Sequence, residues 1–224
     1  MALLILAEHA TTLLDIIYNI SDEKDRVVLP YLQSLVTNLM AFVRTNHSSA
    51  SNLLMNISQY PYTRKAWKKE VFDYLFDIHF FQNDISTLRS WKGIISNWIS
   101  NEKTSFRDIF SKINTASTGL FISKETENEQ RIFLLKRFAF TLYSSSKDQY
   151  QRSLPEILLF LTDNLKIPPQ PILQAQIFLL FRILLLRISN RNLLSFWPIL
   201  VTELLQIFIQ IEQELRNDLE EKNK

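Results

Sequence analysis

Apolar residues recur at intervals of three and four along almost the whole chain, and this spacing limits its possible folds more than any other feature. Side chains three or four residues apart share one face of an α-helix, whereas a half-buried strand alternates every second residue. Alternation of the second kind is nearly absent from this sequence. The spacing therefore predicts an all-α protein with helices at about 2–19, 28–45, 49–58, 63–79, 84–100, 104–114, 127–144, 148–166, 170–188 and 192–217.

Glycine is scarce, because only Gly93 and Gly119 occur among the 224 residues. Tight β-turns depend on glycine, so its scarcity also disfavours an all-β fold. Phosphate-binding loops, dinucleotide-binding motifs and nucleophile elbows need glycines at fixed offsets, and no such set can be written here. Cysteine is absent, which excludes disulfides, cysteine nucleophiles and thiolate zinc sites.

The charges are nearly balanced, since 25 basic and 23 acidic residues give a formal charge of +2. A general nucleic-acid binder carries a stronger basic excess, so that class is disfavoured. The most apolar run, residues 177–188, contains two arginines and is shorter than the ~18 residues of a transmembrane helix. The opening MALLILAEHA lacks a basic segment, so no signal peptide is expected. These features favour a cytoplasmic protein.

Three prolines, each preceded by a large apolar residue, mark a weak internal repeat. Pro155 and Pro198 are 43 residues apart, and Pro30 lies 125 residues before Pro155, close to three units of about 42. Helical hairpins of the HEAT and armadillo kinds repeat every ~40–47 residues. We therefore predict a stack of antiparallel helical hairpins, a HEAT/armadillo-like α-solenoid, as one domain over 1–217 with a charged tail at 218–224 that frays. An irregular helical bundle is the alternative.

The helix predicted at 170–188 is apolar on all sides. Its few polar residues, Gln174, Gln176, Arg182 and Arg187, do not share one face. A helix of this kind is buried on several sides, as an inner helix of a solenoid would be.

The stretch YPYTRKAWKKEVFD gathers Arg64, Lys65, Lys68 and Lys69 around Trp67. The cations fill the first two turns of a predicted helix, although the helix macrodipole favours acidic residues there. We therefore predict a site for an anion, either a phosphoinositide headgroup or an acidic partner segment. The alternative is that these cations pair with acids on an adjacent helix or are solvated. Trp67 could insert at a membrane interface, but its place on the apolar stripe favours the core. A second, weaker cluster with the same two interpretations consists of Arg131, Lys136 and Arg137.

The last predicted helix carries a heptad-like apolar seam with 4-3-4-3-4 spacing. Either this helix packs inward as the core helix of the last repeat, or it docks a partner or a second copy of the chain. The seam consists of Trp197, Val201, Leu204, Phe208, Ile211 and Leu215.

The residues that most often carry catalysis or bind metals show no grouping. His9, His47 and His79 are far apart in the sequence and lack the spacing of metal ligands. We therefore predict no catalytic residue, no metal and no cofactor, and a protein that acts by binding.

Several long segments resemble the C-terminal region of the Dopey family in order and spacing. The resemblance covers roughly residues 25–215 and is carried by YPYTRKAWKKEVFD, TSFRDIF, EQRIFLLKRFAF, DQYQRSLPEI, FRILLLRIS and SFWPILVTELLQIF. Dopey proteins are very large scaffolds of membrane traffic on the Golgi apparatus and endosomes. The family is associated with a large Arf-exchange-factor-like protein, with phospholipid flippases, with phosphatidylinositol 4-phosphate and with kinesin-1.

The resemblance and the residues together predict a non-enzymatic scaffold or adaptor domain. It would lie peripherally on Golgi, trans-Golgi network and endosome membranes and bind those partner proteins, with a homodimer through the last helix as a further possibility. A peripheral phosphoinositide-binding module is the alternative. A helical-repeat nucleic-acid binder is less favoured, because no base-reading pattern recurs in each unit.

Overall fold

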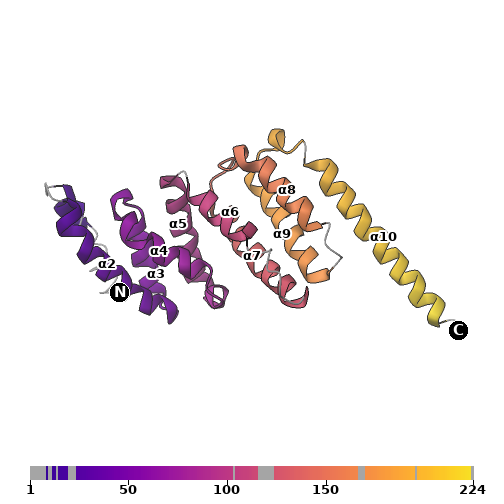
Figure 1. Ribbon diagram of the computed structural model, residues 1–224, viewed down its shortest axis with the longest axis horizontal. Helices are drawn as coiled ribbons and strands as arrows, with labels where there is room; N and C mark the ends of the chain where they lie inside the picture. Colours follow the sequence, from indigo (N-terminus) through magenta and orange to yellow (C-terminus); the bar gives the residue numbers. More distant parts are fainter. Residues whose placement is uncertain are drawn as a thin grey trace. The chain divides into compact units, whose positions relative to one another are not determined.

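The computed structural model describes residues 9, 12–13, 15–19, 24–102, 104–115, 124–165, 170–194 and 196–222. The chain forms two compact units, Met1–Ser145 and Ser146–Lys224. The regular structure of the described residues is helical, with no strand among them (Figure 1). The predicted all-α fold is therefore confirmed, whereas the single domain over 1–217 stays a prediction. The first predicted helix, at 2–19, falls largely outside the described residues.

The first unit contains six long helices and two short 3₁₀ turns among its described residues. They are α2 (Lys24–Arg44), α3 (Ser48–Ser58), η1 (Pro61–Thr63), α4 (Arg64–Leu75), η2 (Phe80–Gln82), α5 (Ile85–Asn101), α6 (Ser105–Thr115) and α7 (Lys124–Ser144).

Helices of this unit pack on their second neighbours as well as on their first. Helix α2 contacts α3 and α4, α3 contacts α5, and α5 contacts α6 and α7. A stack of helical hairpins requires this arrangement, because each hairpin must bury its apolar face against the next. The contacts within this unit are thus those expected of stacked helical hairpins. A continuous solenoid along the whole chain stays a prediction.

The core of the first unit is rich in aromatic rings. The side chains of Trp67, Trp91, Trp98 and Phe80 are fully buried. The rings of Phe80 and Trp91 meet edge to face with centroids 5.4 Å apart, which is a favoured geometry for an aromatic pair. The core therefore joins α4, η2 and α5 through large rings that are hard to replace.

The second unit contains η3 (Gln151–Ser153), α8 (Leu154–Leu165), α9 (Pro171–Arg187), η4 (Asn190–Asn192) and α10 (Trp197–Lys222). Helices α8 and α9 pack against each other as a hairpin. Pro155 and Pro198 are the second residues of α8 and α10, where the missing N–H has no intrahelical partner to lose. Pro30, in contrast, lies inside α2, because that helix begins four residues earlier than predicted.

Two other expectations need correction. Helix α4 ends at Leu75 rather than at residue 79, because Asp77 forms a turn in which its carboxylate accepts the N–H of His79 at 2.8 Å. Helix α9 is buried along one side only, since Ile172, Leu179 and Leu186 form an exposed stripe on it.

Helix α10 includes residues 218–222, and fraying of the tail stays a prediction.

No described helix combines the length and the apolar character needed to cross a membrane.

Candidate functional site

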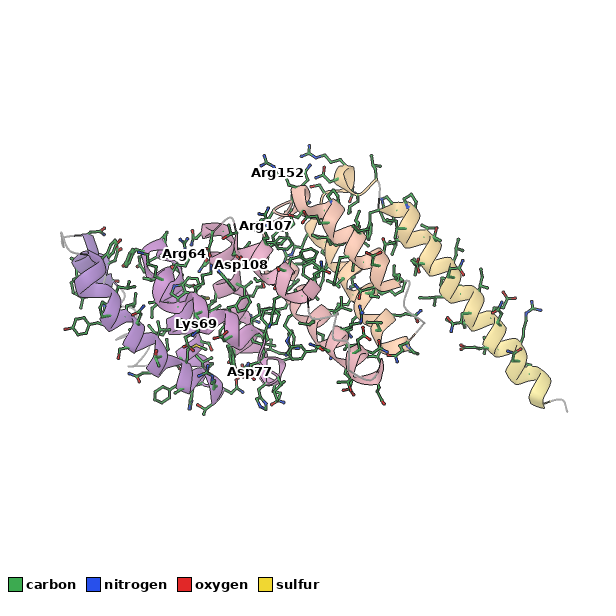
Figure 2. The ribbon with its side chains drawn as sticks, in the orientation of Figure 1. Arg64, Lys69, Asp77, Arg107, Asp108 and Arg152 are labelled. Carbon is green, nitrogen blue, oxygen red and sulfur yellow. The ribbon has the colours of Figure 1, made fainter. Side chains whose placement is uncertain are left out.

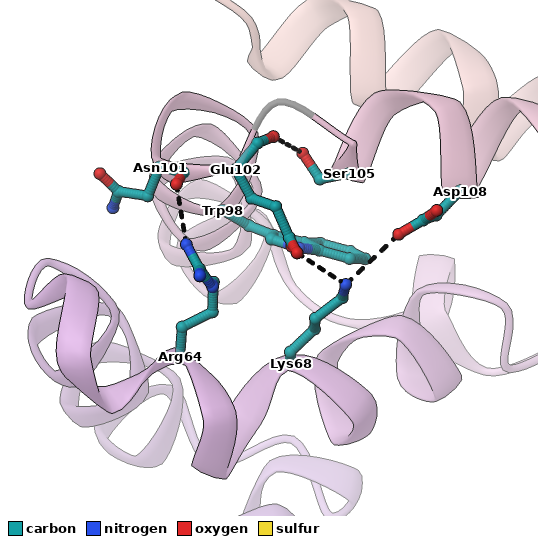
Figure 3. A network of polar contacts seen from close by, with 7 residues as sticks. All are labelled: Arg64, Lys68, Trp98, Asn101, Glu102, Ser105 and Asp108. Carbon is teal, nitrogen blue, oxygen red and sulfur yellow. Dashed lines mark hydrogen bonds and ion pairs between the residues drawn. The ribbon is translucent and has the colours of Figure 1, made fainter.

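Two cations of the basic stretch on α4 bind neighbouring helices of the same unit (Figure 3). Arg64 donates to the backbone carbonyl of Asn101, the last residue of α5, at 2.8 Å. Lys68 lies 3.0 Å from the Glu102 carboxylate and 3.3 Å from that of Asp108 on α6. A cation beside the carboxyl end of a helix is favourable, so the first turns of α4 stabilise the end of α5.

Glu102 lies at the centre of this network. Its carboxylate also accepts the indole N–H of Trp98 at 3.0 Å, and its backbone carbonyl accepts the hydroxyl of Ser105 at 2.7 Å. Burial favours the neutral carboxyl, but the hydrogen bonds from Lys68 and Trp98 together outweigh it and lower the pKa of Glu102. Burial likewise opposes the charge of Lys68, yet its bonds to Glu102 and Asp108 raise its pKa.

Trp67 does not belong to a surface site. Its ring is fully buried, and its indole N–H donates to the Thr63 hydroxyl at 2.9 Å. The interpretation of Trp67 as a membrane-inserting residue is therefore wrong, because its apolar stripe faces the core.

Lys65 and Lys69 are the exposed cations of the stretch and lie one helical turn apart. Figure 2 marks Lys69 on α4 and Asp77 just beyond the end of that helix. A binding site for an anion stays a prediction for these two lysines, whose side chains are more exposed than those of Arg64 and Lys68.

The second predicted basic cluster is not a surface cluster. Arg137 is almost fully buried and donates to the backbone carbonyls of Asp77 at 2.7 Å and Phe133 at 3.1 Å. Arg131 pairs with Glu127 at 2.7 Å, and Lys136 is exposed. The prediction of a joint anion site of these three cations is therefore wrong, because Arg137 is buried and binds backbone carbonyls inside the first unit.

Helix α10 exposes the apolar seam that the heptad spacing identified. Exposure of the seam residues ranges from 37% for Leu204 to 64% for Phe208. Among the described apolar residues of the helix, Leu200 in the first turn is the buried one. The inward packing of this helix as a repeat core is therefore not what the structure shows. The exposed apolar residues of the helix are Trp197, Val201, Leu204, Leu205, Phe208, Ile209, Ile211, Leu215 and Leu219.

Acidic residues flank the last heptad of this seam, a feature that the predictions from the sequence did not include. On a helical wheel Glu212 and Glu214 border the seam on opposite sides. Arg216 binds Glu212 at 2.7 Å, so the nearest cation is already engaged. The heptad positions themselves could have revealed these flanks, because residues next to the seam set partner choice in coiled coils.

Among the described residues, no group of three or more His, Cys, Asp or Glu side chains is placed so that it could hold a metal ion.

Comparisons with known proteins identify the family. The family described as DOP1 C-terminal matches residues 4–224. Protein DOP1B of Mus musculus is 43% identical over an alignment of 230 residues, which covers 99% of this chain and 10% of that protein. Protein DOP1 homolog of Drosophila melanogaster is 39% identical over 232 residues, covering 98% of this chain and 9% of that protein. Protein pad-1 of Caenorhabditis elegans is 37% identical over 226 residues, covering 96% and 9%.

The chain thus spans about a tenth of the length of these relatives. No solved structure matches it. Because the family match covers nearly every residue and the identities are high over the same length, the chain belongs to the DOP1 family, also called the Dopey family, in the part described as DOP1 C-terminal.

Proposed function

We propose that this chain is a non-enzymatic binding domain of a membrane-traffic scaffold that works at Golgi, trans-Golgi network and endosome membranes. The proposal rests on family membership and on the role that the Dopey resemblance implies for the much longer proteins of that family.

The observation that carries the proposal is the exposed seam of α10. Soluble monomers rarely expose large contiguous apolar patches, and such patches mark interaction sites when they occur. Nine large apolar side chains of one helix are exposed, among them Phe208 and Leu215. We therefore assign partner binding to α10.

The candidate partners are the Arf-exchange-factor-like protein, a phospholipid flippase and kinesin-1. Each would be purified and its binding to this chain measured by biolayer interferometry. We expect at least one to bind the unaltered chain and to lose binding to a Leu204→Ser, Phe208→Ser variant.

A matched control variant, Leu179→Ser with Leu186→Ser, changes two exposed apolar residues on α9. We expect this control to bind like the unaltered chain, because it leaves α10 intact. Full binding by the α10 variant would show that the partner uses another surface. No binding by any candidate would reject these partners for this domain.

A second candidate function, binding of phosphatidylinositol 4-phosphate, is favoured by the exposure of Lys65 and Lys69 on consecutive turns of α4. Two neighbouring exposed cations suit a phosphate group.

A further inference from the structure

The spacing of the seam on α10 indicates the shape of what covers it. Apolar residues in a 4-3 repeat form a stripe along a helix, which Leu205 and Ile209 widen here, and knobs from a second helix fit between them. The seam from Trp197 to Leu215 spans 19 residues, or about 27 Å at a rise of 1.5 Å per residue. A straight stripe of this length matches an extended helix better than a loop or a compact surface.

The charges of α10 indicate the chemistry of that helix. Residues 197–222 contain six carboxylates and two cations, a formal charge of −4, within a chain whose total is +2. Glu212 and Glu214 occupy the positions on either side of the last heptad of the seam, where coiled coils place the charges that select a partner, whereas Leu205 and Ile207 occupy them one heptad earlier. Complementary charge on the occupant would steer it to the seam and fix its register.

We propose that α10 binds an amphipathic helix of a partner protein whose apolar seam is flanked by lysines or arginines. This inference rests on the proposed function, in which α10 is the binding surface, and names the class of partner.

Two other occupants fit the charges less well. A second copy pairing through α10 would place two helices of the same negative charge side by side, and like charges across a seam are unfavourable. An anionic membrane would be repelled by the same carboxylates.

The test uses two synthetic helical peptides with identical leucine seams. One carries lysine at the two positions that flank the seam, and the other carries glutamate there. Trp197 supplies the signal, because it is half-exposed whereas Trp67, Trp91 and Trp98 are fully buried. We expect the lysine peptide to shift Trp197 emission to shorter wavelength and to bind at least about tenfold more tightly than the glutamate peptide. A Trp197→Phe variant should lose the shift.

Two variants separate the seam from its charges. Leu204→Ser with Phe208→Ser should abolish binding of both peptides, whereas Glu212→Lys with Glu214→Lys should reverse the preference between them. Glu156→Lys, which changes an exposed acid on α8, is the charge control and should leave the preference unchanged.

The outcomes also distinguish the two levels of the proposal. Equal binding of both peptides through the seam would overturn the basic partner and keep α10 as the binding surface. No binding of either peptide would overturn the inference, and the candidate-partner measurement would then judge the proposed function separately. Dimers in analytical ultracentrifugation that the seam variant does not form would show that a second copy of the chain occupies the seam. Binding to neutral phosphatidylcholine vesicles that the seam variant loses would show that a membrane occupies it. Either result would overturn the proposed partner helix.

Discussion

Arg137 is a charged side chain inside the first unit, and backbone oxygens hold it there. Its guanidinium carbon lies 3.3 Å from the centre of the Phe133 ring, and its nitrogens reach the carbonyls of Asp77 and Phe133. Burial lowers the pKa of Arg137 to about 10, and the nearby charge of Asp77 opposes this shift. The side chain remains charged at neutral pH and ties α7 to the turn after α4.

Replacing this arginine should destabilise the first unit. Arg137→Ala would remove the part-buried side-chain bonds to the carbonyls of Asp77 and Phe133, and we expect a loss of about 2–3 kcal/mol in the free energy of unfolding. Lys136→Ala, at the exposed neighbouring position, should change it by less than ~0.5 kcal/mol. Urea denaturation followed by circular dichroism measures both. Equal effects of the two substitutions would contradict a structural role for Arg137.

Asp148 plays a comparable part in the second unit. Its backbone φ is 60°, in the left-handed region that Asp and Asn tolerate better than other residues with a side chain. Its carboxylate accepts the N–H and the hydroxyl of Ser189 and the amide of Asn192, and its own N–H donates to the carbonyl of Arg187 at 2.8 Å. The bonds from Ser189 lower the pKa of Asp148.

Substitutions at Asp148 should separate backbone conformation from charge. Asp148→Asn keeps both the tolerance for positive φ and a carbonyl acceptor, whereas Asp148→Ala loses both. We expect the urea midpoint of the second unit to fall more for Ala than for Asn. Because the folded pKa is depressed, the gap between the unaltered chain and the Asn variant should narrow as the pH falls through that pKa. A larger loss for Asn than for Ala would contradict this account.

At the scale of elements, α3 and α5 cross at Gly93. A Cβ atom built at this glycine would lie 2.7 Å from the sulfur of Met55, closer than real contacts allow. Alanine stabilises a helix interior by about 1 kcal/mol relative to glycine. The position therefore balances helix propensity against room for the methionine.

A double-mutant cycle tests this balance. Gly93→Ala alone should change the free energy of unfolding little, because displacement of Met55 offsets the gain in helix propensity. In a Met55→Ala background the same substitution should stabilise by about 1 kcal/mol. Identical effects in both backgrounds would show that the methionine does not restrict this crossing.

The network around Glu102 joins α4, α5 and α6, and its contribution to stability depends on pH. The folded pKa of Glu102 lies below the ordinary 4.5. The stabilisation by this carboxylate is therefore complete above about pH 5 and is lost as the pH falls through the folded pKa. Glu102→Gln should lower the free energy of unfolding by about 1 kcal/mol at pH 7, with a smaller difference below pH 4. Urea titrations between pH 2.5 and 7 measure it. Glu129→Gln, at an exposed position of α7, should show no comparable change; a pH-independent loss for Glu102→Gln would remove the charge from the explanation.

At the scale of the whole molecule, the basic helix serves the fold and is also a candidate for lipid binding. Because Lys68 binds Glu102 and Asp108, its substitution would disturb the packing of three helices. A membrane test must therefore leave Lys68 unchanged.

Lys65→Glu with Lys69→Glu provides that test. We expect the variant to lose co-sedimentation with vesicles containing phosphatidylinositol 4-phosphate while it keeps its helicity and thermal midpoint, because both side chains are exposed. Vesicles without this lipid and a single-stranded oligonucleotide are the controls. If the unaltered chain binds these vesicles and the variant sediments equally well, residues other than Lys65 and Lys69 bind the lipid.

The sequence by itself determined the helical class, most helix positions, the seam of α10 and the family resemblance. These depend on spacing within one helix or on order along the chain, which local chemistry fixes. Only the tertiary structure decided which cations are exposed. The sequence does not distinguish the more buried cations Arg64, Lys68 and Arg137 from Lys65 and Lys69. The structure shows that these three bind residues 34 to 60 positions away in the chain. Packing between distant segments selects those pairs, and it likewise buried Trp67 and left α10 exposed, because burial depends on what the fold places against a face.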